Sequence, residues 1–318
     1  MTSQTAEEVQ PAGVTLACFG DTHCGSTVGV MRPKQYQFGE TNVVSNPARR
    51  SLYRVFKDYA YTIRDKRQGK RLVTVLMGDL VDGVHHGTKQ LLTHYAHEQR
   101  AIFLDLAHEF MQIVGYSSSD GDKIYVLHGT NVRETHGTPS DTHEIGKELG
   151  AVPFIPPKIE LAELDEFGRP NETGGEYGWQ DLELDIYGNL VQLTHHAPTG
   201  RGTRAHTYGN TMRSWARSHQ MILDARRKPI PRYVIWGHKH TAHEEPVRFD
   251  NGKSGGAWTT AVCIPAFQGK SDWVKQALPL VQPTSIGGWW ANFEPDGSTY
   301  SGLEYVELNL ERKPEKIA

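Results

Sequence analysis

The chain has 318 residues, and its 34 Lys and Arg against 37 Asp and Glu give a formal net charge of -3 with histidine neutral. Hydrophobic residues make up 37% and charged residues 22%, which supplies enough apolar material for a buried core and argues against extensive disorder. The near-neutral charge weighs against binding nucleic acid through bulk charge alone, although a local basic groove stays open.

The ends and the cysteines indicate the cellular setting. Residues 1–13 are polar and acidic, without the apolar stretch of a secretory signal, and no apolar run reaches the length of about 18 residues that a membrane span needs. We expect a flexible tail at 1–13, one domain over 14–312 and a short tail at 313–318. The three cysteines cannot all pair and have no zinc-finger spacing, so a reducing, cytoplasmic setting is expected.

The first half of the chain alternates strand and helix signals. Apolar runs predict buried strands at 14–19, 72–77 and 124–127. A helix is predicted to begin at Asn46-Pro47, with Asn as N-cap and Pro in the first helical position, and a longer one falls within 89–114. This alternation predicts parallel strands joined by right-handed crossovers.

The second half is richer in short strands. Residues 151–180, rich in Pro, Gly and acidic side chains, are expected to be irregular. Strands are predicted at 182–186 and 190–194 around the turn Tyr187-Gly188-Asn189, and further strands at 233–236, 245–249, 258–264 and 303–308, with a helix within 204–226. The simplest architecture is one domain of two packed sheets flanked by helices.

Five strand-like runs end in side chains that bind metals. These motifs are Asp21-Thr22-His23, Gly78-Asp79-Leu80-Val81-Asp82, His128-Gly129-Thr130-Asn131, Thr194-His195-His196 and Gly237-His238-Lys239-His240. Loops after the carboxyl ends of strands converge in α/β sheets, so these side chains can meet in one site. Their imidazole nitrogens and carboxylate or amide oxygens suit Mn, Fe, Zn, Co or Ni better than Ca. Two such metals need a bridging carboxylate, and Asp79 fits that place.

The order Asp-x-His, Gly-Asp-x-x-Asp, Gly-x-Asn, His and Gly-His-x-His resembles the calcineurin-like metallophosphoesterase superfamily, and it runs from Asp21 to His240. Residues 21–26, 83–87 and 265–270 are similar to the phage and prophage branch, which would place the protein in the host cytoplasm. The resemblance implies a four-layered α/β sandwich with two central mixed sheets flanked by helices. It also implies two divalent ions and hydrolysis of phosphomonoesters or phosphodiesters by a metal-bound hydroxide.

The resemblance also implies a ligand set. Asp21, His23 and His240 would hold one ion, Asn131, His195 and His238 the other, and Asp79 would bridge them. Asp82 is expected to orient a ligating histidine or to cap its loop.

The third motif departs from the family's Gly-Asn-His. Read without a gap, Thr130, a poor ligand, stands at the ligand Asn. A shift by one residue restores Asn131 but puts Val132 where the family has the histidine that protonates the leaving group. His136 could fold back as that acid, and Arg133 could stabilise the phosphoryl charge. Glu134 is a further candidate ligand.

Other side chains near the motifs are candidates for catalysis or substrate binding, against the alternative of ordinary loop or core residues. His86 is a candidate catalytic residue, and His85, His196, Arg201 and Arg204 are candidate phosphate or substrate contacts. Trp289 and Trp290 could stack on a base, although the core is the favoured place for them.

The combined reading is a metal-dependent phosphoesterase that acts on a phosphodiester, with a nucleotide or nucleic acid as candidate substrate and no membrane partner. A DNA nuclease of the same superfamily is an alternative, weakened by the near-neutral charge. A non-catalytic phosphate- or protein-binding scaffold is another, raised by the altered third motif. The sequence leaves the oligomeric state open.

Overall fold

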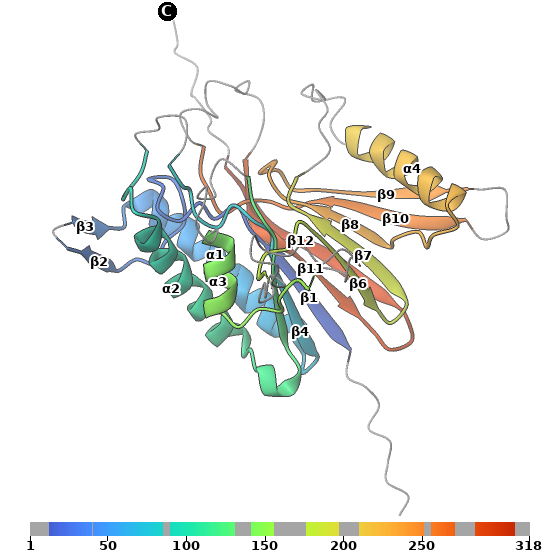
Figure 1. Ribbon diagram of the computed structural model, residues 1–318, viewed down its shortest axis with the longest axis horizontal. Coiled ribbons are helices and arrows are strands. Elements are labelled where there is room, and N and C mark those ends of the chain that lie inside the picture. The colour runs from blue at the N-terminus through green and yellow to red at the C-terminus, as the bar shows by residue number, and fades with distance from the viewer. Residues whose placement is uncertain are drawn as a thin grey trace, which may run out of the picture.

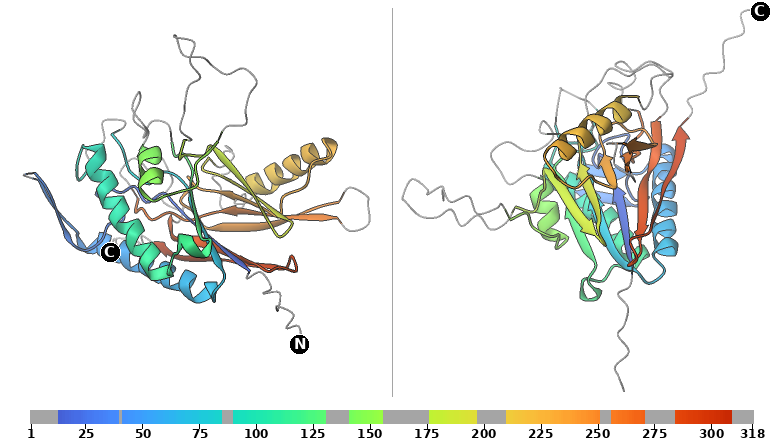
Figure 2. Two further views of the ribbon diagram at one scale, coloured as in Figure 1. Left: turned by 60° about the horizontal axis from the view of Figure 1, so that its bottom comes forward. Right: turned by 90° about the vertical axis from the view of Figure 1, so that its right-hand side faces the viewer.

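Two five-stranded β-sheets packed face to face form the centre of the computed structural model, with helices on the outer side of each (Figures 1 and 2). The structure describes residues 13–39, 41–84, 90–130, 141–155, 176–196, 210–250, 256–270 and 284–308. The predicted tails lie outside these ranges except for Gly13, as does most of the segment predicted to be irregular.

The first sheet has the strand order β12-β11-β1-β4-β5. Its strands are β1 (Val14–Phe19), β4 (Arg71–Leu76), β5 (Lys123–Val126), β11 (Thr284–Phe293) and β12 (Thr299–Leu308). As predicted, β1, β4 and β5 are parallel, and β11 and β12 extend the sheet in antiparallel pairs. The carboxyl ends of the three parallel strands therefore lie along one edge.

The second sheet has the order β6-β7-β8-β10-β9. Its strands are β6 (Asp181–Ile186), β7 (Asn189–Thr194), β8 (Tyr233–Trp236), β9 (His243–Phe249) and β10 (Ala257–Cys263). The central strands β7, β8 and β10 are parallel, and β6 and β9 are antiparallel edges. This sheet is mixed as well.

The turn between β6 and β7 is one residue shorter than predicted. Asn189 pairs with Ile186 across the hairpin, which leaves Tyr187 and Gly188 as the two turn residues. Both have positive φ, 50° and 78°. A two-residue turn of this kind matches the twist of the flanking strands, which explains why Asn189 joins β7.

Helices close the two outer faces. The α-helices are α1 (Pro47–Arg67), α2 (Ala96–Val114), α3 (Asp141–Glu148) and α4 (Asn210–Ala225), and the 3₁₀ turn η1 (Ser118–Asp120) follows α2 without burying a residue. The start of α1 is the predicted one, because the Asn46 side chain accepts a hydrogen bond from the Arg49 amide at 2.8 Å and Pro47 follows it. Helices α1 and α2 cover the first sheet, and α4 covers the second.

The core has one layer between the sheets and one under each helical face. Trp289 is fully buried between the sheets, and its ring centroid lies 5.3 Å from that of Tyr233 on β8. Phe19, on the other face of β1, packs against Phe56 of α1 and Phe110 of α2. The order helix, sheet, sheet, helix confirms the predicted four-layered α/β class with two mixed sheets.

Some elements carry no signal in the sequence pattern. The short hairpin of β2 (Gln35–Phe38) and β3 (Thr41–Val44), helix α3 and strand β11 belong to this group. Trp289 and Trp290 lie in β11 and are 0% and 5% exposed, so both belong to the core and not to a stacking surface. Within the described part of the chain, none of the helices has the length and apolar character that crossing a membrane requires.

Candidate metal centre

The metal-binding motifs meet where the carboxyl ends of the parallel strands of both sheets come together. Asp21 and His23 follow β1, Asp79 follows β4 and Thr130 follows β5 in the first sheet. His195 follows β7, and His238 and His240 follow β8, in the second sheet. Each sheet thus contributes about half of the site, as expected for loops after strand carboxyl ends.

One cluster consists of Asp21, His23 and His240, whose ligand atoms all lie within 4.8 Å of one another. The Asp21 Oδ1 atom lies 3.2 Å from Nε2 of His240 and 3.8 Å from Nε2 of His23. Asp21 and His23 are fully buried. These three side chains are those that the family resemblance implies for one ion.

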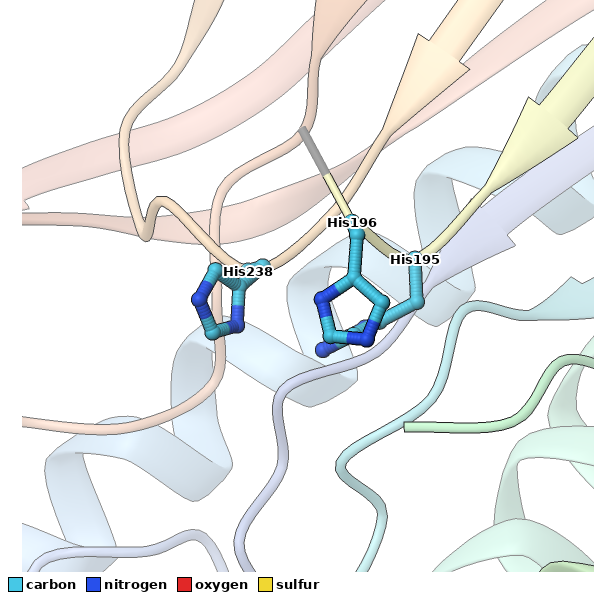
Figure 3. Close-up of side chains that lie close together, drawn as sticks. All are labelled: His195, His196 and His238. Carbon is cyan, nitrogen blue, oxygen red and sulfur yellow. The ribbon is translucent and has the colours of Figure 1, made fainter. Parts of the chain in front are cut away.

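A second cluster consists of His195, His196 and His238, again within 4.8 Å (Figure 3). The ring centroid of His195 lies 4.9 Å from that of His196 and 5.2 Å from that of His238. His195 is buried, whereas His196 is exposed. His196 is therefore not a core residue, which leaves its interpretation as a candidate contact in the site.

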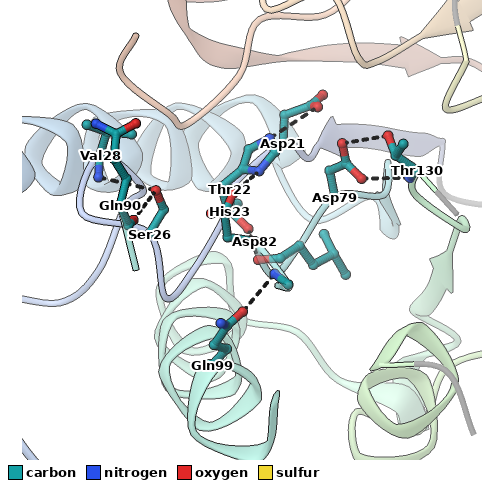
Figure 4. A network of polar contacts seen from close by, with 12 residues as sticks. Asp21, Thr22, His23, Ser26, Val28, Asp79, Asp82, Gln90, Gln99 and Thr130 are labelled. Atoms are coloured by element: carbon teal, nitrogen blue, oxygen red, sulfur yellow. Dashed lines mark hydrogen bonds and ion pairs between the residues drawn. The ribbon is translucent and has the colours of Figure 1, made fainter. Parts of the chain in front are cut away.

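Asp79 lies between the two clusters. Its Oδ2 atom lies 3.3 Å from Nε2 of His195, and its carboxylate shares a third group of candidate ligands with Asp21 and His195. The backbone amide of Thr130 donates to Asp79 Oδ1 at 2.7 Å, and the Thr130 hydroxyl donates to Oδ2 at 3.0 Å (Figure 4). The carboxylate is thereby held in a fixed orientation.

Two histidines are oriented through their Nδ1 atoms. Nδ1 of His23 lies 3.0 Å from Asp82 Oδ1, and Nδ1 of His195 lies 2.7 Å from the backbone oxygen of Met77 (Figure 4 shows the first pair). A carbonyl oxygen only accepts, so Nδ1 of His195 donates to Met77, and Nε2 is the ring atom that faces Asp79. Asp82 thus contacts a candidate ligand, one of the two roles expected for it.

The backbone around the site adopts an unusual conformation. Asp21, His23, Asp79, His238 and His240 all have φ between 45° and 68°. They are five of the eight non-glycine residues with positive φ in the described chain. Such residues cost on the order of 1–3 kcal/mol each and are concentrated at functional sites.

The electrostatics favour a cation. Burial acts to raise the pKa of Asp21, but the charge of His240 and the hydrogen bonds of His23 and His240 lower it well below its usual range. Burial lowers the pKa of His238 to about 4 and also lowers that of His196. Burial acts to lower the pKa of His195, but the hydrogen bond to Asp79 and the charges of Asp21 and Asp79 raise it to about 9. Ionised Asp21 thus lies beside the neutral imidazoles of His196 and His238, and the negative charges that keep the proton on His195 would attract a metal cation in its place.

Several predicted site residues lie outside the described residues. They are His85, His86, Asn131, Arg133, Glu134, His136, Arg201 and Arg204. Cys24, next to the first motif, is buried and its Sγ donates to the Val30 backbone oxygen at 3.3 Å. From the sequence, Thr130 is expected to be a poor metal ligand. In the structure it is the residue of the third motif that contacts Asp79 and His238.

No protein-family model matches this chain, and neither does any curated protein. Solved structures that match include Vacuolar Protein Sorting 29 from Cryptosporidium parvum, at 11% identity and a TM-score of 0.36 over 93% of this chain and 98% of that one. Zinc-complexed Vps29 from Entamoeba histolytica matches at 11% identity and a TM-score of 0.33, over 92% and 98%.

The names of two further matches refer to hydrolytic activities. A predicted phosphoesterase from Streptococcus pneumoniae matches at 11% identity and a TM-score of 0.27, over 93% of this chain and 98% of that one. The sulfate thiohydrolase SoxB from Thermus thermophilus matches at 12% identity and a TM-score of 0.32, over 94% and 58%. These TM-scores are low, so the assignment to the four-layered class is based on the sheets, helices and core of this chain itself.

Proposed function

We propose that this protein is a metal-dependent phosphoester hydrolase of the calcineurin-like metallophosphoesterase type, with phosphodiesters as its substrates. The observation that carries the proposal is the convergence of seven histidine and aspartate side chains from both sheets, which form two adjoining clusters with Asp79 between them. A strained backbone at five of these seven residues supports it, because such conformations are concentrated at functional sites.

The residues present fit a pair of divalent ions. Asp21, His23 and His240 would hold one ion, His195 and His238 would contribute to the other, and Asp79 would bridge the two. This mixture of imidazole and carboxylate donors suits Mn, Fe, Zn, Co or Ni. Bound ions would lower the pKa of a coordinated water toward about 7 and stabilise negative charge on phosphoryl oxygens.

The chain's own part in this function is to orient the donors and to contact the phosphate. Asp82 and the Met77 carbonyl direct Nε2 of His23 and of His195 into the site. We assign His136, Arg133 and His86 to proton transfer and phosphoryl-charge stabilisation, and His85, Arg201 and Arg204 to phosphate contacts, as proposals from the sequence alone.

The test is Asp79→Asn, with Asp58→Asn as control because Asp58 is exposed on α1, away from the site. We expect Asp79→Asn to abolish turnover of bis-p-nitrophenyl phosphate with Mn, Ni or Zn while the circular dichroism spectrum stays native. Turnover close to that of the unsubstituted protein would refute the bridging role.

The same assay separates the alternatives. Preference for single-stranded DNA over bis-p-nitrophenyl phosphate would favour a nuclease. A protein that binds metal but hydrolyses neither of these substrates nor p-nitrophenyl phosphate would be the non-catalytic scaffold, for which Thr130 at the third motif is the structural argument.

A further inference from the structure

The third motif meets the second histidine cluster through Thr130. The Thr130 hydroxyl lies 3.4 Å from Nδ1 of His238 and 3.5 Å from Nε2 of His195, besides its 3.0 Å hydrogen bond to Asp79. The hydroxyl therefore lies between the Asp79 carboxylate and both imidazoles. This is the position that the family's ligand asparagine takes when the third motif is aligned without a gap.

His196 reaches the same cluster because the chain bends directly after β7. In a continuing strand, neighbouring side chains point to opposite faces. Here residues 195 and 196 form a bend, and the two rings lie on the same side, with the His196 centroid 5.3 Å from that of His238 (Figure 3). Its ligand nitrogen lies within 4.8 Å of those of His195 and His238.

We propose that the second divalent ion is held by three imidazoles, those of His195, His196 and His238, together with the Thr130 hydroxyl and the shared carboxylate of Asp79. This inference rests on the proposed metal centre and assigns His196 to the metal and not to substrate. Thr130 takes the place at which the sequence resemblance implies an asparagine ligand.

The two ions would then differ in chemistry. The first has two carboxylates, Asp21 and Asp79, and two imidazoles, whereas the second has one carboxylate, three imidazoles and a neutral hydroxyl. Carboxylate-rich sites suit Mg and Mn, and imidazole-rich sites suit Zn, Ni and Cu. We expect Mn to fill the first position readily and the second weakly, and Zn to fill both.

The experiment measures metal binding without turnover. The metal-free protein is titrated with Zn and, separately, with Mn by isothermal titration calorimetry, and bound metal is counted after gel filtration. The variants are His196→Ala, Thr130→Val and Asn131→Ala, and the control is His108→Ala, an exposed histidine on α2. Thermal melts of the metal-free variants check folding, and because His196 is exposed its loss leaves the core intact.

We expect two Zn ions in the unsubstituted protein and in the control. His196→Ala and Thr130→Val should weaken the second ion alone, His196→Ala by roughly 10–100-fold or more, the range for losing even an indirect partner of a ligand. Two ions of unchanged affinity in both variants, or weakening by Asn131→Ala only, would overturn this inference and leave the proposed function standing. Fewer than two Zn ions in the unsubstituted protein would overturn both.

Discussion

The loops that carry Asp21 and Asp79 hold each other in their strained conformations. The amide of Asp21 donates to the Gly78 oxygen at 2.9 Å, and that of His23 donates to the Asp79 oxygen at 3.1 Å. The parallel pairing of β1 and β4 thus continues past the strand ends and fixes residues that have positive φ. These backbone bonds offset the local strain and give the donor atoms one arrangement before any ion binds.

Gly78 packs closely against the second cluster. It has φ +86°, and a Cβ there would lie 2.8 Å from both the His128 oxygen and Nδ1 of His195. We expect Gly78→Ala to displace His195 from the Met77 carbonyl and to weaken binding of the second ion, measured by calorimetry, besides destabilising the fold.

The matched control is Gly69→Ala, because Gly69 has φ +79° but an added Cβ would meet nothing within 4 Å. It reproduces the backbone strain, about 1–2 kcal/mol, without the collision. Equal metal affinities for the two variants would show that position 78 tolerates a side chain. The orientation of His195 would then not depend on a glycine there.

At the scale of elements, Asp105 of α2 ties the segment around β2 to the body of the molecule. Its carboxylate accepts hydrogen bonds from Arg32 Nη1 at 2.7 Å and from the Tyr36 hydroxyl at 2.6 Å, and it pairs with Lys34 at 2.8 Å. Burial acts to raise the pKa of Asp105, but the bonds from Lys34, Tyr36 and Arg32 lower it. The lowered pKa makes this contact stabilising wherever the carboxylate is ionised.

We therefore expect Asp105→Asn to lower the free energy of unfolding by about 1 kcal/mol at pH 7, a modest amount because the ion pairs are partly exposed. Because the pKa of Asp105 is lower in the folded than in the unfolded protein, its ionised carboxylate stabilises the fold at pH values above its unfolded pKa of about 3.9. This stabilisation is lost as the pH falls through the pKa of the folded protein. The difference between the variant and the unsubstituted protein should shrink below about pH 4 in urea titrations. A difference independent of pH would contradict this account.

Strand β11 shows why one element was missed. Gly287-Gly288 suggests a turn, but the backbone runs straight through it, and the glycines serve close packing. A Cβ on Gly288 would lie 2.5 Å from the Tyr59 ring, and one on Gly287 would lie 1.9 Å from the Glu304 oxygen. The neighbours that demand these glycines come from α1 and β12, which local patterning does not reveal.

At the scale of the whole molecule, the proposed ions would join the two sheets. Asp21, His23, Asp79 and Thr130 come from the first sheet, and His195, His196, His238 and His240 from the second. A ligand that binds only the folded state stabilises it by about 2.7 kcal/mol at 100 times its dissociation constant.

Metal addition should therefore raise the melting temperature of the chelator-treated protein by several degrees, and removal by EDTA should reverse the rise. Differential scanning calorimetry with Zn, Mn, Co and Ni checks this. The prediction fails if no ion shifts the transition, or if Asp79→Asn shifts as much as the unsubstituted protein.

From the sequence by itself come the strands other than β2, β3 and β11, the helices α1, α2 and α4, the start of α1 and the strand ends from which donor side chains arise. These follow from hydrophobic periodicity and capping, which act over a few residues, and from the convergence of parallel strand ends. Three features were visible only in the tertiary structure: Thr130 faces the second cluster, the His196 ring lies on the same side of the chain as that of His195, and Asp82 contacts His23. Each of these depends on pairing between distant segments and on a bend in one loop, which no local pattern specifies.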